Sequence, residues 1–131
     1  LTVSVSAAEP TIKLLVNGVD KTGALDHRIY VSENGNVMVP MVATLKQLGI
    51  TMEHKGDGIY KGMGNNGEIV IDAKNGTAEI DWVEMELPEP ICYDTDGTTM
   101  MPAYLIEDAA KTQPAVYDAE ADKLYYTELD T

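Results

Sequence analysis

A pattern of apolar and polar positions occurs twice in the chain, about sixty residues apart. In the first copy the apolar segment Val37–Pro40 precedes an amphipathic stretch that ends at Gly49, and a strand, a turn and a strand follow. In the second copy Thr99–Pro102 precedes a similar stretch to Lys111, and again two short strands follow. A repeat of this period is one supersecondary unit used twice. We therefore expect neither half to bury its apolar face alone.

The two amphipathic stretches predict two short helices. Proline suits the first turn of a helix, because its missing N–H would be unpaired there, and glycine suits the residue after the last turn. In the first stretch Val42, Leu45 and Leu48 form one apolar stripe. In the second, the apolar side is formed by Leu105, Ile106, Ala109 and Ala110. We expect both stripes to face a sheet in one shared core.

Alternating apolar positions predict strands for most of the remaining chain. The clearest hairpin joins 68–73 to 77–82 through Asn75-Gly76, a dipeptide typical of tight hairpin turns. The glycine-rich segment 62–67 is expected to be a loop between the halves. The sequence thus predicts an α+β fold of mainly antiparallel strands, in two tandem pseudo-repeats with one short helix each. Residues 9–131 would form one domain with half-repeats at about 9–64 and 65–131.

The chain is strongly acidic. Among its 131 residues are 22 acidic and 9 basic side chains, which give a formal net charge of −13. Such a surface repels phosphate backbones and anionic lipids, so we expect neither nucleic-acid binding nor membrane insertion. No apolar run reaches the roughly 18 residues of a spanning helix. Cys92 is the single cysteine, and we interpret it as a small buried residue on a strand.

The first eight residues resemble the end of a secretory signal. Leu1 to Ala8 combine apolar residues with small ones, and Glu9-Pro10 would begin the mature chain. We therefore interpret residues 1–8 as a signal-peptide remnant and expect an exported protein, extracellular or associated with the cell wall. The alternative is an ordinary terminus without fixed structure.

The repeated unit resembles a known bacterial module. Leu15-Val16-Asn17-Gly18, Val37–Pro40, Leu45-x-x-Leu48-Gly49, Met100-Met101-Pro102 and Val116–Asp118 carry the resemblance. They are similar to the copper amine oxidase N-terminal-domain-like repeat of exported bacterial proteins, over roughly 11–129. The family usually has Leu-Arg after the proline, where this chain has Met41-Val42 and Ala103-Tyr104. The second half also lacks the glycine that ends the helix.

The family's name does not imply a copper site. Amine oxidase chemistry belongs to a separate catalytic domain with three copper-ligating histidines, whereas this chain has only His27 and His54. A copper site built from nitrogen ligands needs more imidazoles. Met38, Met41, Met100 and Met101 are interpreted as core residues rather than thioether ligands. We expect no specific copper site, at most weak calcium binding, and no cofactor.

Other candidate sites have structural alternatives. Asp94-Thr-Asp96-Gly97 resembles the start of a calcium loop, and Asp118, Glu120 and Asp122 place three carboxylates at alternate positions; both segments are favoured as turns, and calcium binding stays open. A set of aromatic residues is a candidate ligand platform, although aromatic residues on strands are usually packed in the core or across strands. The set comprises Trp82, Tyr93, Tyr104, Tyr117, Tyr125 and Tyr126.

These observations favour a non-catalytic exported module at the cell surface or cell wall, which either binds a partner or acts as a spacer. Its partner would be a cell-wall polymer or another exported protein. The alternative is a small enzyme or inhibitor whose site lies near the 62–67 segment or at Tyr117-Asp118.

Overall fold

The computed structural model describes residues 11–64, 67–87 and 97–129. This part of the chain is an α+β fold with two short helices and twelve strands. The helices are α1 (Met41–Gln47) and α2 (Ala103–Ala110), with a 3-10 turn η1 (Thr22–Ala24). The strands are β1 (Lys13–Val16), β2 (Val19–Asp20), β3 (Tyr30–Val31), β4 (Val37–Pro40), β5 (Met52–His54), β6 (Ile59–Met63), β7 (Glu68–Asp72), β8 (Thr77–Ile80), β9 (Val83–Glu86), β10 (Met100–Pro102), β11 (Val116–Asp118) and β12 (Lys123–Tyr126).

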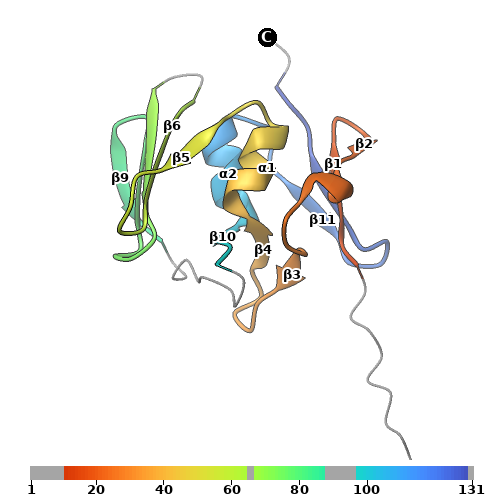
Figure 1. Cartoon of the computed structure of the whole chain (residues 1–131). Coiled ribbons are helices and arrows are strands. Elements are labelled where there is room, and N and C mark those ends of the chain that lie inside the picture. Colours follow the sequence, from red (N-terminus) through yellow and green to blue (C-terminus); the bar gives the residue numbers. More distant parts are fainter. Residues whose placement is uncertain (1–10, 65–66, 88–96, 130–131) are drawn as a thin grey trace, which may run out of the picture.

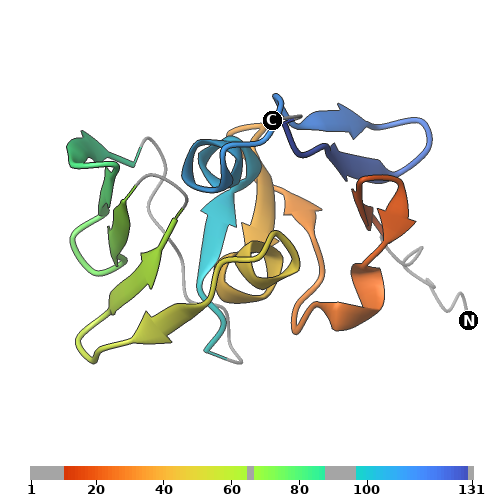
Figure 2. The same ribbon diagram turned by 90° about the horizontal axis from the view of Figure 1, so that it is seen from above.

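The described strands form three sheets. The orders are β11-β12-β1-β2, β10-β4-β3 and β5-β6-β7-β8-β9. Figure 1 shows the two helices with the three-stranded sheet in the middle, and Figure 2 shows the other two sheets on either side of them. β1 and β12 run parallel, and the other pairings between described strands are antiparallel.

The two strand–helix segments lie side by side at the centre. β4 and β10 pair antiparallel, with Val39 opposite Met101 and Pro40 opposite Met100. Each helix begins directly after the proline of its strand. Pro40 has a φ of −65° and stands just before the first helical residue, where its missing N–H costs no helix hydrogen bond. Proline therefore ends the strand and starts the helix at one position.

Each outer sheet combines strands from both parts of the sequence. The β5–β6 hairpin follows α1 and pairs through β6 with β7, whereas the β11–β12 hairpin follows α2 and pairs through β12 with β1. Neither the segment before residue 64 nor the one after it contains a complete outer sheet. Each outer sheet is therefore completed by one strand pairing between the two parts, β1 with β12 and β6 with β7.

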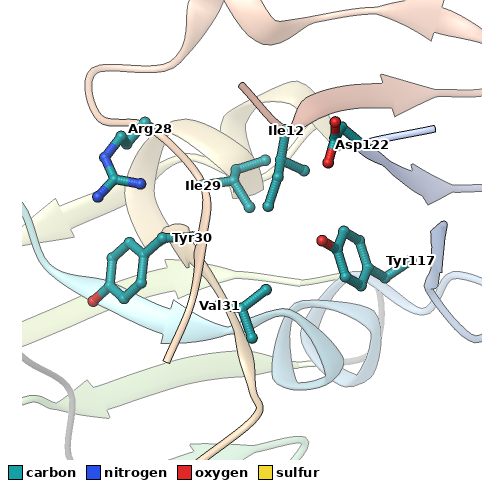
Figure 3. A pocket seen from close by; sticks show the side chains of 7 residues that line it. All are labelled: Ile12, Arg28, Ile29, Tyr30, Val31, Tyr117 and Asp122. Atoms are coloured by element: carbon teal, nitrogen blue, oxygen red, sulfur yellow. The ribbon is translucent and has the colours of Figure 1, made fainter. Parts of the chain in front are cut away.

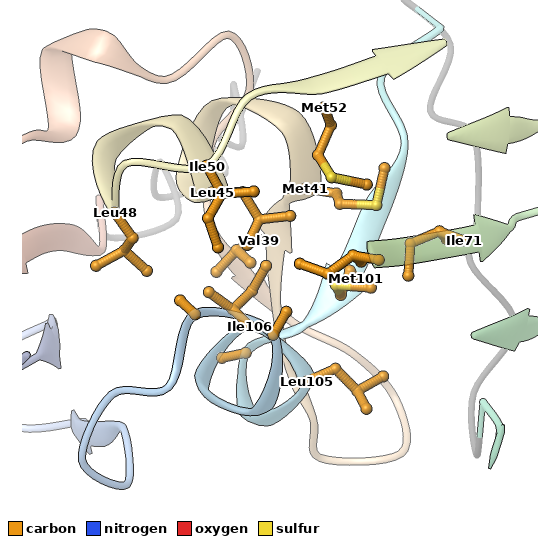
Figure 4. Packing of buried hydrophobic residues seen from close by; sticks show 14 of the residues in the cluster. Val39, Met41, Leu45, Leu48, Ile50, Met52, Ile71, Met101, Leu105 and Ile106 are labelled. Carbon is orange, nitrogen blue, oxygen red and sulfur yellow. The ribbon is translucent and has the colours of Figure 1, made fainter. Parts of the chain in front are cut away.

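The helices contribute their predicted apolar faces to one core (Figure 4). Leu45 and Ile106 are completely buried, and Leu48, Leu105 and Ala109 are buried as well. Val42 is partly buried and packs against the same cluster. The four methionines interpreted as core residues are also buried: Met38, Met41, Met100 and Met101.

Two predicted boundaries were wrong. Gly62 and Met63 belong to β6 and not to a loop. A Cβ on Gly62 would lie 2.7 Å from the carbonyl oxygen of Thr51, so this glycine permits close strand packing and does not mark a flexible connection. The strand predicted to reach Trp82 ends at Ile80, because Asp81 and Trp82 have φ angles of 53° and 69° and form a turn.

Other local predictions have clear outcomes. The hairpin at Asn75-Gly76 is confirmed, with Gly76 at a φ of 70°. Lys111 ends α2 in the left-handed conformation, so a lysine takes the place of the missing glycine.

No helix of the described chain is long and apolar enough to cross a membrane. The predictions for residues 1–8, Cys92, Tyr93 and the start of the calcium-like loop at 94–96 lie outside the described residues.

Candidate functional site

A pocket of about 300 Å³ lies beside β3 and the β11–β12 hairpin. Two tyrosines, an arginine and an aspartate line it together with aliphatic side chains. Figure 3 shows Arg28 and Tyr30 on one side, Tyr117 and Asp122 on the other, and the aliphatic residues between them. The lining consists of Ile12, Arg28, Ile29, Tyr30, Val31, Tyr117 and Asp122.

The pocket occurs where the edges of two sheets meet. β3 is an edge strand of the three-stranded sheet, and β11 is an edge strand of the four-stranded sheet. An antiparallel bridge between Ile12 and Ile29 connects the two regions. Both isoleucines are buried, so they give the pocket an apolar floor. The N–H of Lys13 donates to the carbonyl oxygen of Asp122 at 2.8 Å and fixes the turn that carries this aspartate.

Tyr30 is held by its neighbours on the arginine side. The Arg28 guanidinium carbon lies 5.6 Å from the centre of the Tyr30 ring, within the range of a cation–π contact. The His27 ring meets Tyr30 edge-on, with the ring centres 6.1 Å apart. His27 Nδ1 also donates to the carbonyl oxygen of Arg28 at 2.7 Å. These contacts set the position of the tyrosine ring before any ligand arrives.

The lining suits binding through several kinds of contact. A guanidinium pairs with a carboxylate or a phosphate through a planar fork of N–H donors. The Asp122 carboxylate accepts hydrogen bonds from hydroxyl, amide or ammonium groups. Tyrosine rings and the isoleucine floor contact rings or alkyl groups. Small-molecule sites commonly combine an apolar lining with a few polar groups at this size.

The predicted aromatic residues do not form one platform. Trp82 lies in the β8–β9 turn and is 72% exposed, whereas Tyr104 lies on α2 and is 38% exposed. Tyr117 lines the pocket, and Tyr125 lies on the other side of its sheet, opposite Val116 in the pairing of β11 with β12. Five of the six residues can therefore be placed, at several separate positions, and Tyr93 lies outside the described residues.

Tyr126 is unavailable to a ligand. Its side chain is 1% exposed, and its hydroxyl donates to the carbonyl oxygen of Ala103 at 2.8 Å. Burial raises the pKa of this hydroxyl, and the nearby Glu107 carboxylate adds to the effect. Tyr126 therefore joins β12 to the first turn of α2 and does not present a ring face.

Sequence reasoning missed Arg28 and Tyr30, and it considered Asp122 only as one of three spaced carboxylates. Nothing in the local pattern distinguishes Arg28 or Tyr30 from other residues near a short strand. They become a site because Ile29 pairs with Ile12 and brings β3 close to the β11–β12 hairpin. Only tertiary structure shows this proximity.

At the Tyr117-Asp118 position of the alternative site, Asp118 has a structural role. Asp118 Oδ1 accepts hydrogen bonds from the backbone N–H groups of Glu120 and Ala121 at 3.1 Å each, so it stabilises the β11–β12 turn. Within the described residues, no three His, Cys, Asp or Glu side chains are grouped so as to hold a metal ion. Tyr117 faces the pocket described above.

The other position of the alternative site, near the 62–67 segment, lies beside a larger pocket of about 510 Å³. Lys55 Nζ donates to Glu53 Oε2 there at 2.6 Å. This hydrogen bond, with the positive charge of Lys55, lowers the pKa of Glu53 and favours its ionised form. The lining consists of Thr51, Glu53, Lys55, Lys61, Gly62, Met63 and Glu68.

Comparison with protein families gave one match. The family model described as the copper amine oxidase N-terminal domain matches residues 15–122. Neither the comparison with curated proteins nor the comparison with solved structures gave a match. The matched range includes both helices and all of the pocket lining except Ile12.

Proposed function

The chain belongs to the copper amine oxidase N-terminal domain family, and from this premise we propose that it is a non-catalytic module of an exported bacterial protein that binds cell-wall polymer. The family is a non-catalytic accessory domain. Binding is therefore the role that best fits a chain of this family with a lined pocket on its surface.

The observation that supports binding is the composition of the pocket at β3 and β11. Tyr30 and Tyr117 offer ring faces, and Arg28 and Asp122 offer opposite charges on opposite sides of an apolar floor. Peptidoglycan carries sugar rings, amides, carboxylates and ammonium groups within a short distance. These groups correspond to the contacts that the pocket provides.

The test is a pull-down of the purified chain on insoluble peptidoglycan, at low and high salt. The unchanged chain should be retained in both, because ring contacts are little affected by ionic strength, whereas purely charge-driven adsorption weakens. Tyr117→Ala should reduce retention at least several-fold. Tyr104→Ala removes another partly exposed tyrosine, on α2, and should be retained like the unchanged chain. Equal retention of the two variants, or none of the unchanged chain, would refute pocket binding.

Export is proposed from the resemblance of residues 1–8 to the end of a signal peptide. The protein should be recovered from the culture medium or the cell-wall fraction of its host. Mass spectrometry of that material should show an N-terminus near Glu9. Recovery of the protein solely from the cytoplasm would contradict this part of the proposal.

The absence of catalysis is tested directly. The purified chain should show no turnover on panels of glycosidic, peptide, ester and amine substrates. Reproducible turnover that is abolished by Glu68→Gln or Asp118→Asn would support the enzyme alternative, since these residues belong to the two alternative positions.

A further inference from the structure

The four-stranded sheet carries a pair of lysines on the face that points away from the core. Leu14 and Leu124 are buried in the core, so the residues next to them in the two middle strands, β1 and β12, point outward. Lys13 and Lys123 are opposite each other in the pairing of these strands. The two lysines therefore lie side by side on the middle strands of the outer face.

This lysine pair is not neutralised within its own sheet. Like charges directly opposite each other in neighbouring strands destabilise a sheet, and neither lysine forms an ion pair within the described part of the chain. The aspartates of the face lie on its edge strands and belong to turns. Asp20 accepts a hydrogen bond from the N–H of Thr22 at 2.9 Å, and Asp118 accepts those of the β11–β12 turn.

An apolar row lies beside the lysine pair on the same face. Val116 is opposite Tyr125 in the pairing of β11 with β12, and Tyr125 is opposite Leu15 in the pairing of β12 with β1. Tyr125 and Leu15 each follow a lysine of the pair by two positions, so they share its face. Val116 is 58% exposed, and the other two are partly exposed. The face thus offers apolar contact next to positive charge.

The five-stranded sheet carries a pair of the opposite sign on its own outer face. Ala78 and Ile80 are buried, so Glu79 between them points outward. Glu79 is opposite Glu84 in the pairing of β8 with β9, and neither forms an ion pair within the described residues. Val70 lies beside this glutamate pair on β7. The other charged residues on the strands of this face are Glu53, Lys61, Glu68, Asp72 and Glu86.

The two outer faces point to opposite sides of the molecule. Both sheets contribute their inner faces to one core cluster, and Figure 2 shows them on either side of the central helices. A symmetric contact of one face with the same face of a second copy would bring like charges together. A contact between one face and the opposite face of the next copy brings unlike charges together, and such a heterologous contact continues from copy to copy.

The spacing of the two pairs is the same. Neighbouring strands lie about 4.8 Å apart in any sheet, so two lysines on adjacent strands match two glutamates on adjacent strands. Stacking the faces would relieve the repulsion within both pairs at once. We propose that copies of this chain associate head to tail, with Lys13 and Lys123 of one copy against Glu79 and Glu84 of the next. The proposal does not depend on the pocket at β3 and β11.

The contact is weak for copies free in solution. By strand spacing and rise, the face of the four-stranded sheet measures about 15 Å by 13 Å, well below the roughly 800 Å² per partner of a standard interface. The net charge of −13 also repels approaching copies. At about 0.15 M salt this repulsion is limited to about 8 Å, so the groups in contact decide the outcome. Association is therefore to be measured near about 1 mM chain.

Sedimentation equilibrium of the purified chain under these conditions tests the association. The average mass should exceed the 14.2 kDa of one copy and rise with concentration, because a head-to-tail contact is not closed by two copies. Raising the salt to about 1 M should weaken the association, since the Debye length falls to about 3 Å. A mass that stays at one copy, or one that levels off at two copies, would overturn the proposal.

Charge reversal identifies the faces. The double variant Lys13→Glu, Lys123→Glu has two acidic faces, and the double variant Glu79→Lys, Glu84→Lys has two faces with lysine pairs, so each alone should sediment as one copy. An equimolar mixture should associate again, because each reversed face then meets the reversed face of the other variant. Recovery in the mixture also shows that both variants are folded. Association of either variant alone, or a mixture that stays monomeric, would overturn the proposal.

A matched control separates face contact from general repulsion. The double variant Lys46→Glu, Lys74→Glu changes the net charge as much as the lysine-pair variant does. Both positions are exposed, and neither belongs to the lysine or glutamate pair. This variant should associate within about threefold of the unchanged chain, because the added charge is screened at this salt concentration. Loss of association in this control would show that net charge alone governs the behaviour and would overturn the proposal.

Discussion

The hydroxyl groups of Tyr60 and Thr99 lie 2.8 Å apart in a buried hydrogen bond between residues 39 positions apart in the sequence. Tyr60 belongs to β6 of the five-stranded sheet, and Thr99 directly precedes β10 of the central sheet. The His54 ring stacks on Tyr60, with centres 4.5 Å apart and planes 14° apart. This hydrogen bond therefore joins two sheets that no strand pairing connects among the described residues.

Tyr60→Phe should lower the free energy of unfolding by about 1–3 kcal/mol, because the Thr99 hydroxyl is left buried without its partner. Adding Thr99→Val should recover part of the loss, since both polar groups are then gone. Urea unfolding of the two single variants and the double variant gives the coupling energy. A coupling indistinguishable from zero would show that the bond contributes nothing to stability.

Thr44→Val should stabilise the chain by about 1 kcal/mol. Thr44 is completely buried in α1, and its Oγ1 has no hydrogen-bond partner among the described residues. An unpaired buried hydroxyl costs about 1–3 kcal/mol, and valine keeps the shape without the polar atom.

Thr112→Val is the matched control for this change. The Thr112 hydroxyl donates to the carbonyl oxygen of Gln113 at 2.8 Å, so its removal should destabilise the chain. The thermal unfolding midpoints of both variants test this difference, which should be a rise for Thr44→Val and a fall for Thr112→Val. If both changes lower the midpoint, the Thr44 hydroxyl is paired in solution.

The sequence predicted the central part of the fold because local rules operate there. An apolar strand that ends in proline and is followed by a 3.6-residue stripe has one favourable arrangement, and α1 and α2 begin where Pro40 and Pro102 predict. The Asn75-Gly76 turn follows from an equally local preference.

The pairing of outer strands could not be predicted in the same way. The parallel pairing of β1 with β12 joins residues more than 100 positions apart, and no local signal specifies that partner. The same reason explains the missed pocket residues Arg28 and Tyr30, which become a site through the contact of Ile12 with Ile29. Trp82 was mistaken for a strand residue because apolar alternation continues through the turn, and its positive φ departs from ordinary residue preferences.

Leu45→Ala should destabilise the chain by about 2–5 kcal/mol, the usual cost of a large cavity in a core. Leu45 lies on α1, is completely buried and belongs to the shared core cluster. Lys46→Ala changes the neighbouring exposed residue and should alter stability by less than about 0.5 kcal/mol. A comparably small effect of Leu45→Ala in urea unfolding would show that α1 is peripheral to the core.

Gly62→Ala should destabilise the chain by about 1–3 kcal/mol, the usual cost of overpacking. The added Cβ would lie 2.7 Å from the Thr51 carbonyl oxygen and still closer to Met52 Sδ. Gly23→Ala is the control, because nothing lies within 4 Å of its added Cβ and its φ is not positive. Equal unfolding midpoints for the two variants would indicate that 62–67 is the loose connection that its composition suggested.

Stability should fall in acid partly because of Asp72. Its carboxylate accepts hydrogen bonds from the backbone N–H and the side-chain amide of Asn75, at 3.0 Å and 2.8 Å, in the β7–β8 turn. These bonds lower the pKa of Asp72 below its ordinary value of 3.8. A carboxyl group with a lowered folded-state pKa stabilises the fold fully above its unfolded-state pKa, and it loses this contribution as the pH falls through the folded-state pKa.

Asp72→Ala should therefore be less stable than the unchanged chain at neutral pH, and the difference should shrink as the pH falls below about 4. Urea midpoints measured across the acid range provide the comparison. Glu33→Ala, at an exposed position, controls for the loss of one negative charge from an acidic chain. A difference between Asp72→Ala and the unchanged chain that grows in acid would reverse the sign and contradict the role assigned to these hydrogen bonds.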